Sequence, residues 1–129
     1  MSFQDIKIVG VDKSKTYRPD PEKLLYDVYF KLSSEPPIEW VRIFEAERRF
    51  PRHTMWRRAW VDGQYVVIHC ALDEVKKYHA HDIKQDVANT NKKYGEYLRQ
   101  LVIEQKKERE RKGEELEKID AALEGLDFE

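Results

Sequence analysis

The sequence has few of the features that mark secreted or membrane proteins. Cys70 is the only cysteine among 129 residues, which excludes an intramolecular disulfide and fits a reducing compartment. No apolar run approaches the roughly 18 residues that a membrane helix requires, and the N-terminus lacks a basic segment followed by an apolar one. These absences predict a cytoplasmic protein that does not associate with membranes.

Familiar catalytic motifs are also missing. The five glycines never reach the spacing of a phosphate-binding loop, and no serine has the surroundings of a nucleophile elbow. His69 precedes Cys70, but neighbouring side chains of a strand point to opposite faces, so the two cannot act as a catalytic pair. The sequence therefore favours a protein that is not an enzyme and binds no cofactor, with a site assembled from ordinary residues as an open alternative.

The charges give no argument at the level of the whole molecule. Lys and Arg total 24 and Asp and Glu total 25, so the near-neutral balance favours neither a nucleic acid nor a membrane surface as partner. Any electrostatic role must come from a local concentration of charge.

The apolar pattern predicts an α+β fold. Residues 6–11 are rich in β-branched side chains, and residues 26–32 alternate apolar and polar with the period of a half-buried strand. Ser33–Pro37 suits the start of a helix, which Pro51 would end near Phe50. With the hairpin and second helix described below, the order is ββαββα, which indicates a two-layer sandwich with a four-stranded, mainly antiparallel sheet.

The domain organisation follows from a change in composition along the second helix. Residues 1–103 are expected to form the α+β domain, including the start of the long C-terminal helix. From Glu104 to Glu117 nearly every residue is charged, so residues 104–129 are expected to form a charged helical tail.

The dipeptide Asp62-Gly63 lies between two β-rich runs, which predicts a hairpin with a two-residue type I′ turn. That loop would pair Val61 with Gln64 and Trp60 with Tyr65. One face of the hairpin then carries Met55, Arg57, Ala59, Val61, Val66, Ile68 and Cys70, and the other carries Trp56, Arg58, Trp60, Tyr65, Val67 and His69.

Positive charge is concentrated just before this hairpin. Residues 48–58 contain five arginines and no acidic residue, and tryptophans lie within and just after the run. Guanidinium groups bind phosphate and aromatic rings stack on nucleobases, so the segment could bind single-stranded nucleic acid or another anion. The alternative is that the arginines pair with Glu45, Glu47 and the acidic tail while the aromatic rings are core. The candidate binding residues are Arg52, Trp56, Arg57, Arg58, Trp60 and Tyr65.

The segment His79-Ala80-His81-Asp82 suggests a third type of site. Imidazole and carboxylate groups can ligate zinc or iron, so a metal-dependent enzyme around His79 and His81 is the least favoured hypothesis. Helix capping or simple exposure of the histidines is the alternative. Asp82 with Gln85 forms a capping-box pattern, which favours Asp82 over Asp73 as the start of the second helix.

The C-terminal helix regains an amphipathic pattern after its charged stretch. Its apolar residues could bind a second copy of the chain or another protein, and a helical hairpin folding back at Gly113 or a frayed end are the alternatives. We favour a non-enzymatic interaction or adaptor protein that uses this stripe. The candidate partner-binding residues are Leu116, Ile119, Leu123 and Leu126.

Overall fold

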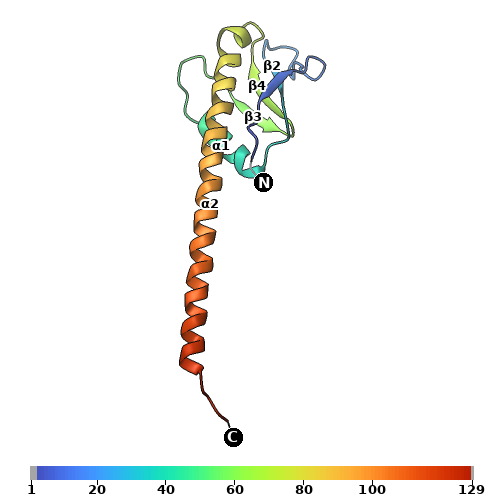
Figure 1. Ribbon diagram of the computed structural model, residues 1–129. Coiled ribbons are helices and arrows are strands. Elements are labelled where there is room, and N and C mark those ends of the chain that lie inside the picture. Colours follow the sequence, from blue (N-terminus) through green and yellow to red (C-terminus); the bar gives the residue numbers. More distant parts are fainter. Residues whose placement is uncertain (1–2, 129) are drawn as a thin grey trace. The chain divides into compact units, whose positions relative to one another are not determined.

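The computed structural model describes residues 3–128 and has the predicted α+β fold, with four strands in one sheet and a long C-terminal helix (Figure 1). The strand order across the sheet is β1-β2-β4-β3, and each neighbouring pair is antiparallel. The strands are β1 (Ile8–Val11), β2 (Tyr26–Leu32), β3 (Ala59–Asp62) and β4 (Tyr65–Cys70). The helices are α1 (Ile38–Arg48) and α2 (Ala80–Leu123), and the π-helical turn η1 (Val75–His79) leads directly into α2.

The chain divides into two compact units, with the division between Gly95 and Glu96. The first, which we call the body, contains the sheet, α1, η1 and the beginning of α2. The second, which we call the distal segment, contains the rest of α2 and the residues that follow it. This division lies eight residues before the boundary that the onset of continuous charge suggests at residue 104.

The core of the body lies between one face of the sheet and the two helices. Trp40 and Phe44 are separated by four positions on α1, which places them on one side of the helix, and their rings stack 5.6 Å apart with neither side chain exposed. Cys70 is fully buried, as its place in the apolar pattern predicts, and burial raises the pKa of its thiol to about 12. The other apolar side chains with no exposed surface in this core are Leu32, Val66, Ile68 and Ile83.

The hairpin forms as predicted, but its turn is one residue further along the chain. Asp62 pairs with Tyr65 and Val61 pairs with Val66, so the loop consists of Gly63 and Gln64 rather than Asp62 and Gly63. Gly63 has φ +57° and is the first central residue of the turn, whereas Gln64 has a negative φ. Positive φ at the first central position alone is the pattern of a type II′ turn, for which glycine is the usual residue.

The corrected register preserves the predicted faces of the two strands. The partner of each residue lies two positions further along the opposite strand than expected. Because side chains alternate between the faces with a period of two, each pair still joins residues of the same face. Ala59 pairs with Ile68 on the core face, and Trp60 pairs with Val67 on the opposite face. The predicted pairings of Val61 with Gln64 and of Trp60 with Tyr65 are therefore wrong, and the ladder ends where β3 begins at Ala59, with the His69 N–H donating to the carbonyl of Arg58.

The second helical segment begins earlier than its capping-box pattern predicts. Helical structure starts at Val75 in η1, so Asp82 lies within the helix and is not its N-cap. Asp82 is instead a buried side chain that pairs with residues between α1 and β3. The helix also continues through Gly113, which contradicts the alternative of a helical hairpin at that residue.

Candidate functional site

A buried carboxylate of α2 binds the arginine-rich segment that follows α1. Nη1 of Arg48 donates to Oδ2 of Asp86 at 3.0 Å, and Nη1 of Arg52 donates to Oδ1 of the same side chain at 2.6 Å. The Asp86 side chain has no exposed surface, and that of Arg48 is 3% exposed. Burial lowers the pKa of Arg48, and the hydrogen bond to Asp86 opposes that shift. This ion pair fixes the end of α1 to the start of α2.

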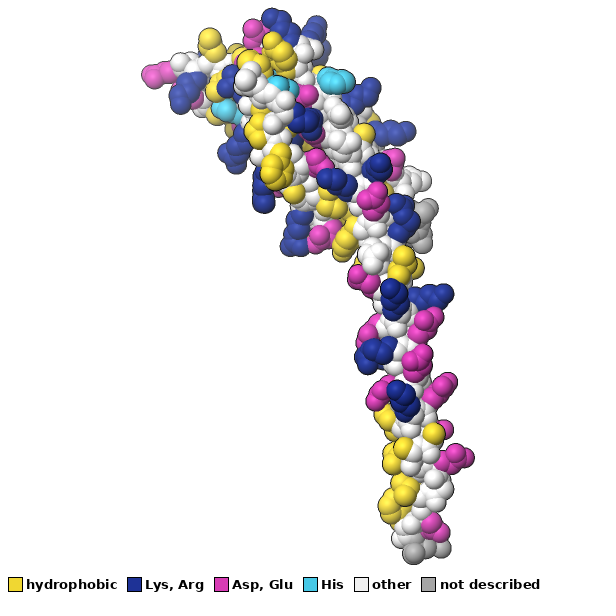
Figure 2. Space-filling model, turned by 90° about the vertical axis from the view of Figure 1, so that its left-hand side faces the viewer, with side chains coloured by type: hydrophobic (Ala, Val, Ile, Leu, Met, Phe, Trp, Pro, Cys, Tyr) yellow, Lys and Arg dark blue, Asp and Glu magenta, His cyan; other side chains and the backbone are white. Residues whose placement is uncertain are grey.

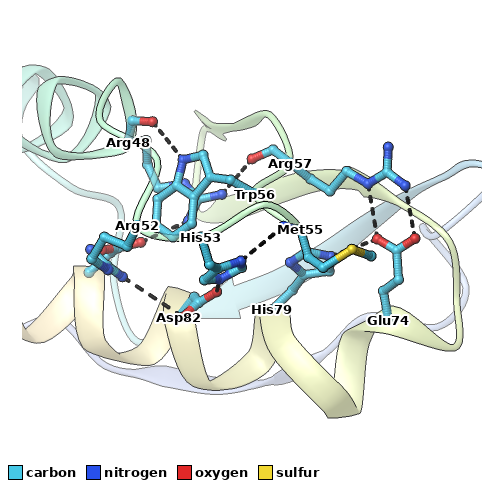
Figure 3. Close-up of polar contacts among 10 residues, drawn as sticks. Arg48, Arg52, His53, Met55, Trp56, Arg57, Glu74, His79 and Asp82 are labelled. Carbon is cyan, nitrogen blue, oxygen red and sulfur yellow. Dashed lines mark hydrogen bonds and ion pairs between the residues drawn. The ribbon is translucent and has the colours of Figure 1, made fainter.

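A second acidic side chain binds the residue just before β3. Nε and Nη2 of Arg57 donate to the two carboxylate oxygens of Glu74 at 3.0 and 2.9 Å, a bidentate arrangement (Figure 3). Nε2 of His79 lies 2.9 Å from Oε1 of the same carboxylate. The Arg57 guanidinium, with a smaller contribution from His79, lowers the pKa of Glu74 to about 2. Glu74 is therefore a carboxylate at any ordinary pH and anchors both neighbours.

Trp56 lies among these charged groups and contacts two of the arginines. Its Nε1 donates to the carbonyl of Arg48 at 2.9 Å. The guanidinium carbons of Arg48 and Arg52 lie 3.7 and 4.6 Å from its ring centroid, and His53 contacts the ring edge-on (Figure 3). His53 in turn lies 2.5 Å from Oδ2 of Asp82. The π-face of Trp56 is thus already occupied by cations of the same chain.

The candidate residues Arg52, Trp56 and Arg57 therefore belong to one internal network. Its acidic members are Glu74, Asp82 and Asp86, and not Glu45, Glu47 or the tail, as the alternative based on internal pairing expects. Glu47 instead forms an ion pair with Lys93. These ion-pair partners could not be predicted from local sequence patterns, because they follow the arginines by 17 to 38 positions.

The other three candidates lie on the sheet face opposite the core, which we call the aromatic face and define by Tyr29, Trp60 and Tyr65. The guanidinium carbon of Arg58 lies 4.8 Å from the ring centroid of Trp60. Tyr29 and Tyr65 meet edge to face at 5.6 Å, and Nζ of Lys15 lies 5.3 and 5.0 Å from their respective centroids. Trp60 and Tyr65 are both partly exposed.

A hydrogen bond at the edge of the aromatic face holds the Tyr65 side chain in place. The Tyr65 hydroxyl donates to Oδ2 of Asp12 at 3.0 Å, which raises the pKa of the phenol. Hydrogen bonds from Ser14 and then from Tyr65 lower the pKa of Asp12. Trp60 and Tyr65 are predicted on this face from the sequence, whereas Lys15 and Tyr29 are not among the predicted binding residues. The alternation of residues 26–32 puts Tyr29 opposite the apolar side, which was the available signal.

The two histidines of the metal hypothesis lie in different surroundings. His79 has no exposed surface and contacts Glu74, whereas His81 is exposed. Over residues 3–128, no group of three or more His, Cys, Asp and Glu side chains has an arrangement that could hold a metal ion.

The predicted partner-binding residues are exposed along the distal segment. Leu116, Ile119 and Leu123 lie on α2, and Leu126 follows the end of the helix; each has about half or more of its surface exposed. Figure 2 shows hydrophobic side chains gathered along this end of the helix and charged side chains along the stretch before it. Val102, further back on α2, is also 61% exposed.

Comparison with known proteins gives no relative from which a function could be transferred. No protein-family model, no curated protein and no solved structure matches this chain. In the part of the chain that the structure describes, no helix combines the length and the apolar character needed to cross a membrane.

Proposed function

We propose that this protein is a non-enzymatic interaction protein that self-associates through one face of the distal part of α2. One observation carries the proposal: five apolar residues in the distal part of α2 share a single heptad register. Starting from Leu98, steps of alternately four and three residues reach Val102, then three polar residues, and then Leu116, Ile119 and Leu123. This alternation defines the a and d positions of a two-stranded coiled coil. We call these eight positions the seam.

The composition of the seam supports a specific pairing of helices and not nonspecific hydrophobic association. Its polar positions are Gln105, Arg109 and Lys112, and such residues within an apolar seam select one register and one number of helices at a cost in stability. Each large apolar side chain that becomes buried contributes roughly 1.5–3 kcal/mol. Two apolar groups separated by a polar centre therefore favour an aligned pair of helices.

Sedimentation equilibrium of the full chain over a range of concentrations tests the proposal. Wild-type protein is expected to form a dimer, and Ile119→Glu is expected to raise the dissociation constant roughly a hundredfold or more, because two buried side chains are lost per dimer. Ala121→Glu is the matched control: it adds the same charge to an exposed position two residues away, outside the seam. Circular dichroism of both variants establishes that α2 remains helical.

Three results would count against self-association. The wild-type chain could remain a monomer at all concentrations, Ile119→Glu could leave the dimer intact, or the control could dissociate it equally. If the chain were a stable monomer that binds a different protein through the same positions, the interaction role would stand, but the partner would be that protein and not a second copy of the chain.

A second candidate function is single-stranded RNA binding at the aromatic face, favoured by the partly exposed Trp60 and Tyr65 with Lys15 and Arg58 beside them. Bases stack on such rings, and phosphate neutralisation makes binding depend steeply on salt. We expect a short mixed-sequence RNA to quench tryptophan fluorescence at low salt, and less at physiological salt. The quenching should be lost in Trp60→Phe. Equal quenching of that variant, or none in the wild type, would exclude this face.

A further inference from the structure

The sheet has an open edge at β1, beside the start of the long helix. Among residues 3–128, β1 pairs with β2 and with no other strand, because it is the last strand in the order of the sheet. A groove of about 610 Å³ lies between β1 and α2, and a second hollow of about 310 Å³ shares Val11 with it and extends along η1. We call these two hollows together the edge groove. Its lining is largely apolar and includes Ile8, Phe30 and Val87 in the first hollow and Val28 and Val75 in the second.

The backbone of β1 has hydrogen-bonding groups that are directed away from β2. The carbonyl of Lys7 accepts from the residue after β2, and the N–H of Asp12 donates to a carbonyl of β2, so both residues face that strand. Neighbouring residues of a strand direct these groups to opposite sides, and those of Ile8 and Val11 therefore face the open edge. The irregularity between Ile8 and Gly10 accounts for their odd spacing.

One hydrogen-bonding position on this open side already has a partner. Asn91 of α2 donates to the carbonyl of Ile6 and accepts from its N–H, which is the pair of bonds that a residue of a neighbouring strand would make. Ile6 precedes Ile8 by two positions, so both face the same side. This edge thus accommodates an amide group from outside the sheet, and the groups of Ile8 and Val11 occupy the next two positions along it.

The helix side of the edge groove has the length of a short peptide. Ala80, Lys84 and Ala88 follow one another at intervals of four, which places them on one side of α2. From Lys76 to Asn91, which both line the edge groove, the helical segment rises about 22 Å at 1.5 Å per residue. An extended chain advances about 3.3 Å per residue, so about seven residues would span this distance with alternate side chains directed into the groove.

The charged residues at the border of the edge groove favour an acidic partner. Four lysines and two aspartates line it, which gives a net charge of +2, and all six side chains are exposed. Asp12, beside them, accepts hydrogen bonds from Ser14 and Tyr65. Complementary charge across an interface favours the correct partner, and like charge opposes others. The six residues are Asp5, Lys7, Lys13, Asp73, Lys76 and Lys84.

We propose that the edge groove binds an extended, acidic segment of another protein, which adds to the sheet as a fifth strand beside β1. Its backbone pairs with Ile8 and Val11, one set of its alternate side chains contacts the apolar lining, and acidic residues of the other set lie near the lysines. When a strand is added at an open edge, main-chain hydrogen bonds supply affinity and side-chain pockets supply specificity. The site lies within the body and is independent of self-association through the distal part of α2.

A titration of the full-length, isotope-labelled chain with a synthetic peptide tests the proposal by nuclear magnetic resonance. The probe is a seven-residue peptide of alternating glutamate and valine with blocked ends. We expect saturable binding below about 1 mM. Hydrogen exchange at the Ile8 and Val11 amides should be slower by about tenfold or more in the complex, because both gain a partner. The Lys7 amide, which donates to Oγ of Ser33, is the internal control and should not change.

Matched variants on α2 test where the peptide binds. Ala88→Glu places a carboxylate in the groove lining and should weaken the affinity for the peptide by about tenfold or more. Gln85→Glu adds the same charge at an exposed position outside the lining and should weaken it by less than about twofold. Lys84→Gln should weaken binding about threefold, whereas Lys92→Gln, exposed on the same helix but outside the lining, should have no effect.

Several results would overturn the proposal. Absence of binding up to about 1 mM would reject it. Binding that leaves hydrogen exchange at Ile8 and Val11 unchanged would also reject it, since the peptide would then contact the groove through side chains alone. Equal binding of a peptide of alternating lysine and valine would reject an acidic partner. Equal weakening by Ala88→Glu and Gln85→Glu would mean that the peptide binds outside the groove. Sedimentation of the chain tests self-association separately from all of these results.

Discussion

Asn91 of α2 binds the backbone of Ile6 through both ends of its amide group. Its Nδ2 donates to the Ile6 carbonyl at 2.7 Å, and its Oδ1 accepts from the Ile6 N–H at 3.0 Å. The same Oδ1 accepts a hydrogen bond from Nε1 of Trp40 at 2.9 Å. One side chain thus joins the segment before β1, helix α1 and helix α2 within the core.

Asn91→Ala is therefore expected to destabilise the body more than an ordinary polar substitution does. Three buried polar groups would lose their partner, and each such loss costs about 1–3 kcal/mol. We expect a total of about 3 kcal/mol in urea unfolding, with faster hydrogen exchange at the Ile6 amide. Asn89→Ala, two positions earlier on the same helix, is the control and should change stability by less than about 0.5 kcal/mol. Slow exchange at Ile6 in the variant would refute this account.

The ion pair between Arg48 and Asp86 gives a prediction about charge burial. Asp86→Asn leaves the Arg48 guanidinium buried without its carboxylate, which typically costs about 3–5 kcal/mol. Arg48→Met in the same chain removes the stranded charge, so the double variant should be more stable than Asp86→Asn alone. Urea unfolding of the two single variants and the double variant measures the coupling. Additive effects would mean that the two side chains do not depend on each other.

The lowered pKa of Glu74 predicts how stability responds to acid. Because the pKa is about 2 in the folded protein and 4.5 ordinarily, the ionised form stabilises the fold above pH 4.5, and this contribution is lost as the pH falls toward 2. Glu74→Gln should lower stability by about 2 kcal/mol at pH 7 and by progressively less below pH 4.5. Asp73→Asn, at the exposed neighbouring residue, is the control. A difference between wild type and Glu74→Gln that stays constant from pH 7 to pH 3 would contradict the assignment.

The position of the hairpin turn can be tested at its glycine. Gly63 has φ +57°, and an L-residue in that conformation costs roughly 1–2 kcal/mol, so Gly63→Ala should destabilise the body by about that amount. Gly10→Ala in β1 is the matched control, because its φ is not positive and an added Cβ would meet nothing within 4 Å. Thermal unfolding compares the two variants. Equal stability would show that the turn tolerates a negative φ at residue 63.

The sequence predicts the elements of this fold better than their contacts. Residues 26–32 alternate so regularly that the strand has the expected bounds. The hairpin was also expected, but Asp62-Gly63 and Gly63-Gln64 are both acceptable two-residue loops, and only pairing along the whole ladder selects between them. The helix start at Val75 was missed because Asp82, the acidic residue of the apparent capping box, belongs to a buried ion-pair network instead.

The candidate site shows the same limit. Composition alone identified the arginine-rich segment, yet its role depends on Glu74, Asp82 and Asp86, which tertiary structure brings to it from a distant part of the chain. Trp56 therefore lies inside a network of cations, whereas Trp60, four residues later, lies on the aromatic face. The local sequence around the two tryptophans does not distinguish these environments.

The continuity of α2 across both units changes how association would proceed. The first turn of an isolated helix forms with an unfavourable free energy, because several residues must be ordered before the first hydrogen bonds offset the lost conformational entropy. Here the body provides that nucleus, since Ile83 and Val87 hold the first turns of α2 in the core. The distal residues extend a helix that already exists. In the proposed self-association, two copies would bind through helices that are already ordered, so little conformational entropy would be lost on binding.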